Sequence, residues 1–258
     1  MNIIPKLEPA LCAGLIGNAK SLVALTGAGV STAAGIPDFR GPGGLYVTRR
    51  YDPEKVFDID WFFRDPRIFY DFSIDFVELM KKTAPTFTHH FLARLEQLGL
   101  LAGVITQNID LLHQEAGSEK VLELHGSYRS ATCNGCGKRY EDLTHDWWDR
   151  AMHESPRRPL AICAACGGVL KPDIVFYGEA VLSIERARQM VERCDLLLVL
   201  GSSLQVMPAS LLPNFTTGTT IVINKGEVSL SPAPHRFFVE DDLNTYCREV
   251  AACLGVDD

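Results

Sequence analysis

Short runs of apolar residues, each followed directly by a polar or glycine-rich loop, constrain the fold of this chain most strongly. Four such runs lie at Leu22–Thr26, Leu101–Thr106, Leu196–Leu200 and Thr220–Ile223. They are continuously apolar, so both faces of each expected strand should be buried, which is typical of a parallel sheet. Helical patterns such as 91–98 and 184–193 stand between them. This order predicts an α/β protein with a doubly wound parallel sheet.

Two stretches interrupt the alternation of strands and helices. Residues 41–82 are rich in proline, glycine and aromatic residues, and residues 128–172 contain two Cys-x-x-Cys pairs. We expect both stretches to be insertions that together form a smaller lobe. The large domain is then expected to comprise residues 1–40, 83–127 and 173–258.

The charge balance and the apolar runs limit the possible partners of the protein. The 258 residues include 25 basic and 32 acidic side chains, a net charge of −7, so no overall positive field favours nucleic acid or an anionic membrane. No apolar run approaches the roughly 20 residues that span a bilayer, and the first residues lack the pattern of a secretory signal. We therefore expect a cytoplasmic protein with no membrane or nucleic-acid partner.

Four of the eight cysteines form two pairs with the spacing of metal ligands, namely Cys133, Cys136, Cys163 and Cys166. Two such pairs complete the tetrahedral site that zinc prefers, and four sulfur ligands leave no open position for catalysis. The sequence therefore predicts one structural Zn²⁺. Because the gap between the pairs is long for a zinc ribbon, His145 and His153 remain alternative ligands.

A glycine-rich loop, Gly27–Thr32, follows the first expected strand and precedes a possible helix at 30–34. Its backbone N–H groups could hold a phosphate, or the loop could be a plain strand-to-helix turn. It is an incomplete dinucleotide fingerprint, since Thr32 stands where a third glycine is expected.

Polar residues also follow the next two apolar runs. Gln107, Asn108, Ile109 and Asp110 come directly after the second expected strand, at the edge where open parallel sheets bind ligands. Asn108 or Asp110 could instead simply cap the following helix. His125 follows the short run 121–124 and is either structural or a general base, since imidazole titrates near neutral pH.

Taken together, these motifs resemble the sirtuin family of NAD-dependent protein deacylases from about residue 10 to 250. Besides the two cysteine pairs, the matching blocks are Gly27–Ser31, Gly35–Gly41, Thr106–Asp110, His125–Gly126, Phe176–Glu179, Gly201–Leu204 and Ile223–Asn224. The resemblance implies a Rossmann-like large domain. It also implies a smaller lobe made of a helical module (41–82) and a zinc-ribbon module (128–172), with NAD and an acyl-lysine protein or peptide meeting between them.

The resemblance also implies roles for individual residues. It places NAD against Gly27, Ala28, Gly29, Thr32, Phe39, Arg40, Gln107, Asn108, Ile109, Asp110, His125, Gly201, Ser202, Ser203, Asn224 and Leu243. Phe39 would cover the reacting ribose and Arg40 would lie near the phosphates. His125 matches the general base, and Asn108 is the second catalytic residue. The acyl-lysine substrate would contact Tyr70, Val175, Phe176, Tyr177 and Gly178.

The implied reaction transfers the acyl group from lysine to ADP-ribose and releases nicotinamide and O-acyl-ADP-ribose. Members that prefer succinyl or malonyl groups carry a Tyr and an Arg three residues later; here Tyr70 aligns, but Ser73 takes the arginine position. Without that cation such substrates should be disfavoured. Mono-ADP-ribosyl transfer and a non-catalytic zinc-ribbon binding module remain as alternatives.

Overall fold

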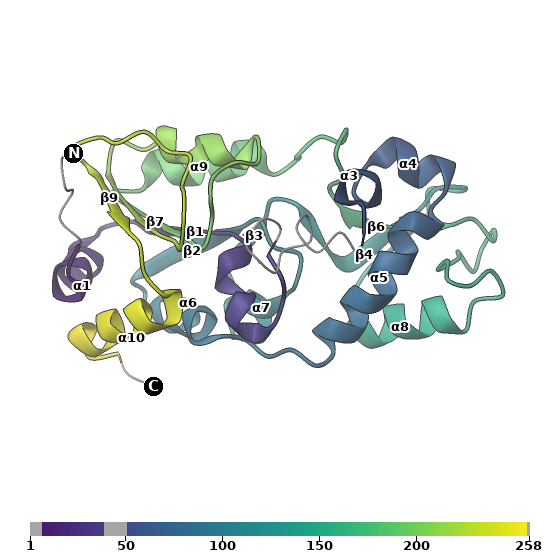
Figure 1. Cartoon of the computed structure of the whole chain (residues 1–258), viewed down its shortest axis with the longest axis horizontal. Helices are drawn as coiled ribbons and strands as arrows, with labels where there is room; N and C mark the ends of the chain where they lie inside the picture. Colours follow the sequence, from purple (N-terminus) through teal and green to yellow (C-terminus); the bar gives the residue numbers. More distant parts are fainter. Residues whose placement is uncertain (1–6, 39–50, 257–258) are drawn as a thin grey trace. The chain divides into compact units, whose positions relative to one another are not determined.

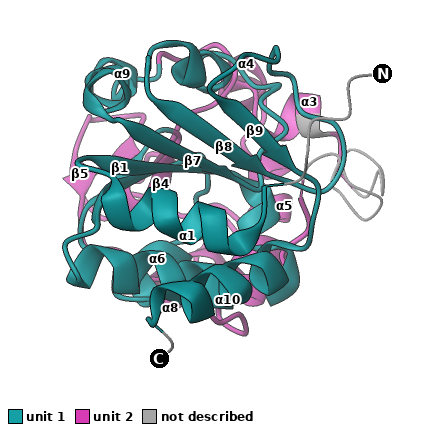
Figure 2. Ribbon diagram, turned by 90° about the vertical axis from the view of Figure 1, so that its left-hand side faces the viewer, with its two compact units in different colours: residues 1–35, 85–124, 181–258 teal, residues 36–84, 125–180 magenta. Residues whose placement is uncertain are grey.

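The computed structural model describes residues 7–38 and 51–256, which divide into two compact units. Unit 1 comprises the described residues of 1–35, 85–124 and 181–258, and unit 2 those of 36–84 and 125–180 (Figure 2). The boundaries differ from those expected from the sequence, because residues 36–38, 83–84, 125–127 and 173–180 fall in unit 2. Strand pairing accounts for part of this difference: residues 126–127 and 173–174 belong to strands of the small sheet of unit 2.

A six-stranded sheet forms the centre of unit 1. Its strands follow the order β3 (Val121–Glu123), β2 (Leu101–Thr106), β1 (Leu22–Thr26), β7 (Leu196–Leu200), β8 (Thr219–Ile223) and β9 (Arg236–Val239). Every neighbouring pair is parallel. The predicted doubly wound parallel sheet is therefore confirmed. The edge strand β9 escaped prediction because it is short and only half-buried.

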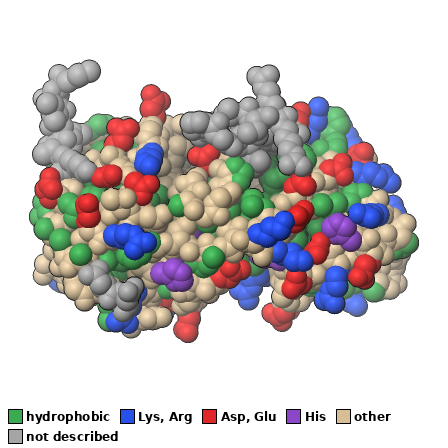
Figure 3. Space-filling model, turned by 60° about the horizontal axis from the view of Figure 1, so that its bottom comes forward, with side chains coloured by type: hydrophobic (Ala, Val, Ile, Leu, Met, Phe, Trp, Pro, Cys, Tyr) green, Lys and Arg blue, Asp and Glu red, His purple; other side chains and the backbone are tan. Residues whose placement is uncertain are grey.

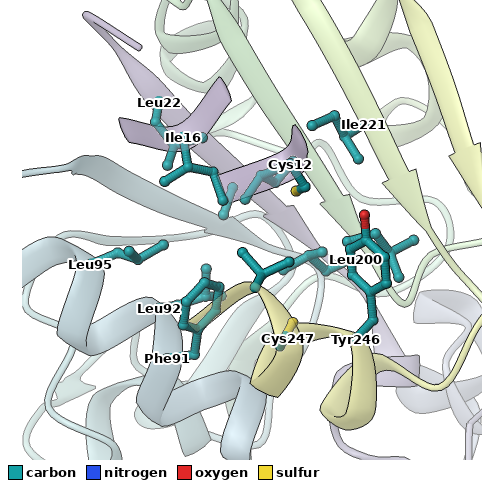
Figure 4. Packing of buried hydrophobic residues seen from close by; sticks show 14 of the residues in the cluster. Cys12, Ile16, Leu22, Phe91, Leu92, Leu95, Leu200, Ile221, Tyr246 and Cys247 are labelled. Carbon is teal, nitrogen blue, oxygen red and sulfur yellow. The ribbon is translucent and has the colours of Figure 1, made fainter. Parts of the chain in front are cut away.

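Helices cover both faces of this sheet (Figure 2). One face packs against α1 (Pro9–Asn18), α6 (Phe87–Gln97) and α10 (Leu243–Leu254), and the other against α9 (Ile184–Arg193). Figure 4 shows the first contact, where Cys12, Phe91 and Tyr246 meet beneath the strands. The Tyr246 hydroxyl donates to the Leu7 carbonyl at 2.8 Å, which ties α10 to the residues before α1.

Unit 2 combines short helices with a three-stranded antiparallel sheet (Figure 1). The sheet has the order β5 (Arg139–Tyr140), β4 (Gly126–Cys133), β6 (Leu170–Ile174). The helices are α3 (Pro53–Val56), α4 (Ile59–Arg64), α5 (Arg67–Met80) and α8 (His145–His153). Several aromatic residues of this stretch form part of the core of unit 2; Phe62, Phe69 and Phe72 are each at most 4% exposed.

Acidic and basic side chains are mixed over the face drawn in Figure 3. Of the helices formed by the described residues, none has the length and apolar character needed to cross a membrane.

The N-terminus of α10 depends on Asp242, whose carboxylate accepts the Thr245 N–H at 3.0 Å. Hydrogen bonds from Lys225 and then from Thr245 lower the Asp242 pKa to about 2. Since the folded pKa lies below the ordinary aspartate value of about 3.9, this contribution to stability is present above that value. It is lost as the pH falls toward the folded pKa.

We expect Asp242→Ala to lower the free energy of unfolding by about 1 kcal/mol at neutral pH, the usual cost of removing a helix cap. Lys225 adds little, because its side chain is 70% exposed. Asp242→Asn, which keeps a cap acceptor, is the control and should lose less. Urea unfolding at neutral pH and near pH 2 measures both effects. If the difference in unfolding free energy between wild type and Asp242→Ala does not shrink in acid, the ionised carboxylate of Asp242 is not its cause.

Candidate functional site

The glycine loop after β1 packs directly against the loop after β7. The N–H groups of Gly27 and Gly29 donate to the carbonyls of Leu200 at 3.0 Å and Gly201 at 2.9 Å. A Cβ atom on Gly27 would lie 2.8 Å from the Gly201 oxygen, and one on Gly29 would lie 2.7 Å from the Gly201 Cα. These contacts are too close for any side chain, so backbone packing requires glycine here.

The helix that the sequence suggests at 30–34 does not form an α-helix. The chain forms two single 3₁₀ turns, Ala28–Val30 and Thr32–Ala34, and Gly35 ends the second with φ +91°. The Thr32 hydroxyl donates to the Gly29 carbonyl at 3.1 Å and thereby stabilises the turn. Phe39 and Arg40, predicted to complete the loop, lie outside the described residues.

Three polar side chains meet next to the glycine loop. The Ser31 hydroxyl donates to Asp110 Oδ2 at 2.6 Å, and Asn108 Nδ2 donates to the Gly27 carbonyl and to Ser31 Oγ, both at 3.2 Å. The other Asp110 oxygen accepts the Leu112 N–H at 3.0 Å, at the start of α7 (Leu112–Glu115). Asp110 therefore joins the loop cluster and also supports the start of the following helix; its contact with a ligand stays a prediction.

Ser31 belongs to the glycine motif but is not among the site residues that the family resemblance implies. Its side chain is 1% exposed and bonds both Asn108 and Asp110. A serine among small residues in a strand-end loop, facing a polar loop on the neighbouring strand, is the signal that could have identified it.

Burial shapes the electrostatics of this cluster. Asp110 is 4% exposed, and desolvation raises the pKa of its carboxyl group even though Ser31 and Leu112 donate to it. A buried carboxylate whose donors only partly replace water is poised to accept a further hydrogen bond. The site thus offers an incoming polar ligand one carboxyl and one amide side chain.

A second polar contact connects the ends of β2 and β7. Gln107 Nε2 donates to Ser202 Oγ at 3.0 Å, and the Gln107 N–H donates to the Thr26 carbonyl at 3.0 Å. Farther along the same edge of the sheet lie the remaining predicted residues of unit 1, Ile109, Ser203, Asn224 and Leu243. The structure therefore gathers the unit 1 candidates at the carboxyl ends of the parallel strands, where such sheets bind ligands.

Two buried histidines lie beside this edge within unit 1. His113 Nε2 contacts the Thr26 hydroxyl at 2.9 Å, and the ring centroids of His89 and His113 are 4.7 Å apart. Burial lowers the pKa of His89 to about 3 and that of His113 to about 4. Both rings are therefore neutral near neutral pH and serve as packed hydrogen-bonding groups.

In unit 2, His125 directly precedes β4 and is half-buried. Its carbonyl accepts the Val175 N–H at 2.8 Å. Gly126 follows with φ +66°, and a Cβ atom there would lie 1.9 Å from the Asp173 oxygen. The His-Gly dipeptide thus has a structural cause: only glycine lets the histidine backbone approach the end of β6 this closely.

The segment Val175–Gly178 follows β6 and leads into a turn, in which Gly178 has φ +92° and the Glu179 N–H donates to the Phe176 carbonyl at 3.0 Å. The Tyr177 N–H donates to the Phe57 carbonyl at 2.7 Å, and the Tyr177 carbonyl accepts the Ile59 N–H at 3.1 Å. Phe176 is 1% exposed, whereas Tyr177 is 46% exposed. Phe176 therefore packs in the core of unit 2, while the Tyr177 side chain faces the surface.

Tyr70 and Ser73 lie in the core of unit 2. The Tyr70 hydroxyl donates to the Leu170 carbonyl at 2.5 Å, and Ser73 Oγ is 2.9 Å from the Tyr128 hydroxyl. Tyr70 and Ser73 are both 0% exposed. An arginine at position 73 would place its charge among these buried aromatic rings. The Tyr70 hydroxyl is thus already bonded to Leu170. A contact between Tyr70 and the substrate stays a prediction.

The four predicted metal ligands come together in unit 2. Their sulfur atoms all lie within 4.8 Å of one another, with 3.5 Å between Cys133 and Cys166 and 3.8 Å between Cys136 and Cys163. A zinc tetrahedron with Zn–S bonds of about 2.3 Å has edges of about 3.8 Å. Within the part of the chain that the structure describes, neither His145 nor His153 belongs to this group.

Hydrogen-bond donors surround these sulfur atoms, as thiolate ligands require. The N–H groups of Gly135, Ala165 and Gly168 donate to Cys133, Cys163 and Cys166 at 3.3 to 3.4 Å. The Tyr140 hydroxyl donates to Cys163 at 3.2 Å, and this bond is the main cause that lowers the Cys163 pKa to about 6. The donor set fits one structural Zn²⁺ bound by four thiolates.

We expect the stability of Asp110→Asn relative to wild type to rise from acidic to neutral pH. The raised folded pKa means that wild-type stability falls as the pH rises above the ordinary aspartate pKa, whereas an amide does not ionise. The amide has one acceptor oxygen for the two donors Ser31 and Leu112, and this loss is the same at every pH. Asp195→Asn is the matched control: the Lys20 and Ser21 N–H groups lower the Asp195 pKa, so its stability relative to wild type should fall from acidic to neutral pH. Urea unfolding at both pH values compares them; an Asp110→Asn protein whose relative stability does not rise toward neutral pH would contradict the electrostatic argument.

We expect Cys163→Ala to lose bound zinc and to melt at a lower temperature, since binding of a structural metal is coupled to folding. Cys253→Ala, which changes an exposed cysteine of α10, is the matched control and should keep both. Zinc analysis beside a melting curve tests this directly. A Cys163→Ala protein that retains one zinc per chain would show that the cysteines are not the ligands.

Comparison with known proteins agrees with this geometry. The model described as "Sir2 family" matches residues 27–208. An "NAD-dependent protein deacetylase 1" of Pyrobaculum aerophilum is 44% identical over 203 residues, 78% of this chain and 76% of that protein. An "NAD-dependent protein deacylase" of Aeropyrum pernix is 37% identical over 255 residues, 95% of this chain and 97% of that protein.

Solved structures show the same fold. A Sir2 protein with a deacetylated p53 peptide and 3′-O-acetyl ADP-ribose has a TM-score of 0.87 and 36% identity, and the match covers 97% of this chain and 100% of that one. A Sir2 protein with a propionylated peptide has a TM-score of 0.81 and 35% identity, covering 95% and 97%. The chain therefore belongs to the Sir2 family.

Proposed function

We propose that the protein is an NAD-dependent protein lysine deacylase that transfers the acyl group to ADP-ribose and releases nicotinamide and O-acyl-ADP-ribose. The family match and the deacetylases and deacylases among its relatives support this activity. Solved relatives contain NAD, acylated peptide or the acetylated ADP-ribose product. The observation that carries the proposal is the buried cluster of Ser31, Asn108 and Asp110 beside the glycine loop.

NAD, when bound, would supply two things: the ribose carbon that the acyl oxygen attacks, and nicotinamide as the group that leaves that carbon. Asn108 and Asp110 present an amide and a carboxyl group, which match the hydrogen-bonding pattern of a carboxamide. Ser31 and the Leu112 N–H hold the Asp110 carboxyl in place. Ser202, Ser203, Asn224 and Leu243 are proposed to line the phosphate and adenosine end.

His125 is proposed to take a proton from a ribose hydroxyl and so promote attack of that oxygen on the acyl carbon. Its backbone is fixed on both sides, by the Val175 N–H and by the close approach of Gly126 to Asp173. A fixed backbone limits the positions that the imidazole can reach, which is what general-base catalysis requires.

The acyl-lysine peptide is proposed to pair with the backbone of the segment Val175–Gly178 as an added strand. Acetyl and longer neutral acyl groups are the preferred substrates in this proposal. Position 73 holds a buried serine hydrogen-bonded to Tyr128 instead of a cation. A succinyl or malonyl carboxylate would therefore lack that charge partner.

The two alternatives are less well supported. A non-catalytic zinc-ribbon module would not account for the polar cluster of Ser31, Asn108 and Asp110 in unit 1. The family match extends through that cluster. Mono-ADP-ribosyl transfer would use the same NAD contacts, but the relatives are named deacetylases and deacylases. We also propose a cytoplasmic location, because all eight cysteines are unpaired, as is typical of a reducing compartment.

Replacing His125 with alanine tests the proposed general base. We expect the rate of peptide deacylation to fall by about 10²–10⁴, the usual contribution of such a group, while NAD binding and the melting temperature stay close to wild type. His153→Ala, which changes an exposed histidine of the same unit, is the matched control. Nicotinamide release and peptide mass, followed with acetyl-lysine peptide and NAD, measure the rate; near-wild-type turnover by His125→Ala would refute the assignment.

A further inference from the structure

A buried lysine in β6 has no role in the function described so far. Lys171 is 9% exposed, and its ammonium lies 2.8 Å from Glu179 Oε2. The two residues stand at opposite ends of the segment that includes Val175–Gly178. This ion pair, the Lys171–Glu179 pair, therefore closes a loop around the proposed peptide-binding strand.

The remaining contacts of the lysine lie within the same segment. Its ammonium donates to the Ile174 carbonyl at 2.8 Å and to the Pro172 carbonyl at 3.3 Å. It also lies 4.3 Å from the centroid of the Phe176 ring. An ammonium has three N–H donors, and Glu179, Ile174 and Pro172 together can use all three.

Glu179 completes the loop from the other end. Its Oε2 atom accepts the Phe176 N–H at 2.8 Å, and its own N–H donates to the Phe176 carbonyl at 3.0 Å. One carboxylate thus binds both the buried ammonium and the backbone in the middle of the segment. Losing the charge of Lys171 would remove the cation that holds this carboxylate in place.

The segment held by the pair positions two parts of the proposed site. The Val175 N–H donates to the His125 carbonyl at 2.8 Å, and Tyr177 pairs through its backbone with Phe57 and Ile59. The same segment is the one proposed to receive the acyl peptide. A shift of Val175–Tyr177 would therefore move both the peptide edge and the backbone of the proposed general base.

A buried ion pair adds little net stability compared with well-packed apolar residues, but it does impose a particular geometry. We propose that Lys171 and Glu179 are positioning residues that fix Val175–Tyr177 for the acyl-peptide substrate and align His125. This inference rests on the proposed deacylase function. It concerns a charged pair that acts through backbone contacts and touches neither NAD nor peptide.

Steady-state kinetics of Lys171→Met test the proposal. We expect kcat/KM for an acetyl-lysine peptide to fall by about 10²-fold, as for a small misplacement of reacting groups. The peptide KM should rise and, because His125 shifts as well, kcat per folded enzyme should fall, while the KM for NAD stays near wild type. Lys171→Arg restores the cation and should recover most of the loss. A merely structural role would lower kcat for lack of folded enzyme and leave the peptide KM unchanged.

Lys81→Met is the matched control. Lys81 also lies in unit 2 and forms ion pairs with Asp146 at 3.0 Å and with Asp149 at 2.6 Å. The substitution removes both pairs, but neither partner lies in the 171–179 segment. We expect it to change stability alone. Amide hydrogen exchange of Val175, Phe176 and Tyr177 gives a readout that does not depend on activity, and Lys171→Met should speed it while Lys81→Met does not.

Unchanged exchange of these amides in Lys171→Met, or an unchanged peptide KM, would overturn the proposal. An equal rise in the KM values for peptide and NAD would also overturn it, since the effect would then not be specific to the peptide edge. The proposed function fails in a different way: wild-type protein would release no nicotinamide from NAD and acetyl-lysine peptide. Measuring the wild type first therefore separates the two failures.

Discussion

The parallel pairing of β1 with β2 on one side and β7 on the other is the constraint on which the candidate NAD site depends. In this register Thr26 lies beside Thr106 and Leu200, so the three strands end at one level. The loops that follow them must then share the same small space. This is why Gly27, Asn108 and Ser202, far apart in the sequence, take part in one set of backbone and side-chain contacts.

Features that arise from short-range patterns were predictable from the sequence. Continuous apolar runs identified β1, β2, β7 and β8, because strands buried on both faces must be apolar throughout. The spacing of Cys133, Cys136, Cys163 and Cys166 identified the sulfur cluster, because two residues between ligands let one turn of chain present both sulfur atoms. Gln107, Asn108 and Asp110 were identified because they directly follow an apolar strand, at the edge where parallel sheets bind ligands.

Features that arise from tertiary contacts were not predictable. The 3₁₀ turns after Gly27 replace the expected helix because the loop packs against Gly201. Ser31 is a small residue whose importance comes from a partner 79 residues away, Asp110. Likewise, nothing near Lys171 in the sequence shows that its ammonium is buried, since that follows from the chain turning back at Glu179. Phe39 and Arg40 stay predictions from the family resemblance.

The contact between the glycine loop and Gly201 also limits how this protein can be redesigned. Cofactor preference in dinucleotide-binding proteins is naturally sought in the phosphate loop, yet no side chain can be added at Gly27 or Gly29 without pushing the neighbouring loop away. The two loops are in direct backbone contact, so a larger residue in one requires a compensating change in the other. Attempts to make the protein accept an altered dinucleotide should therefore begin at the far end of the sheet edge, around Asn224, where the side chain is free of this backbone contact.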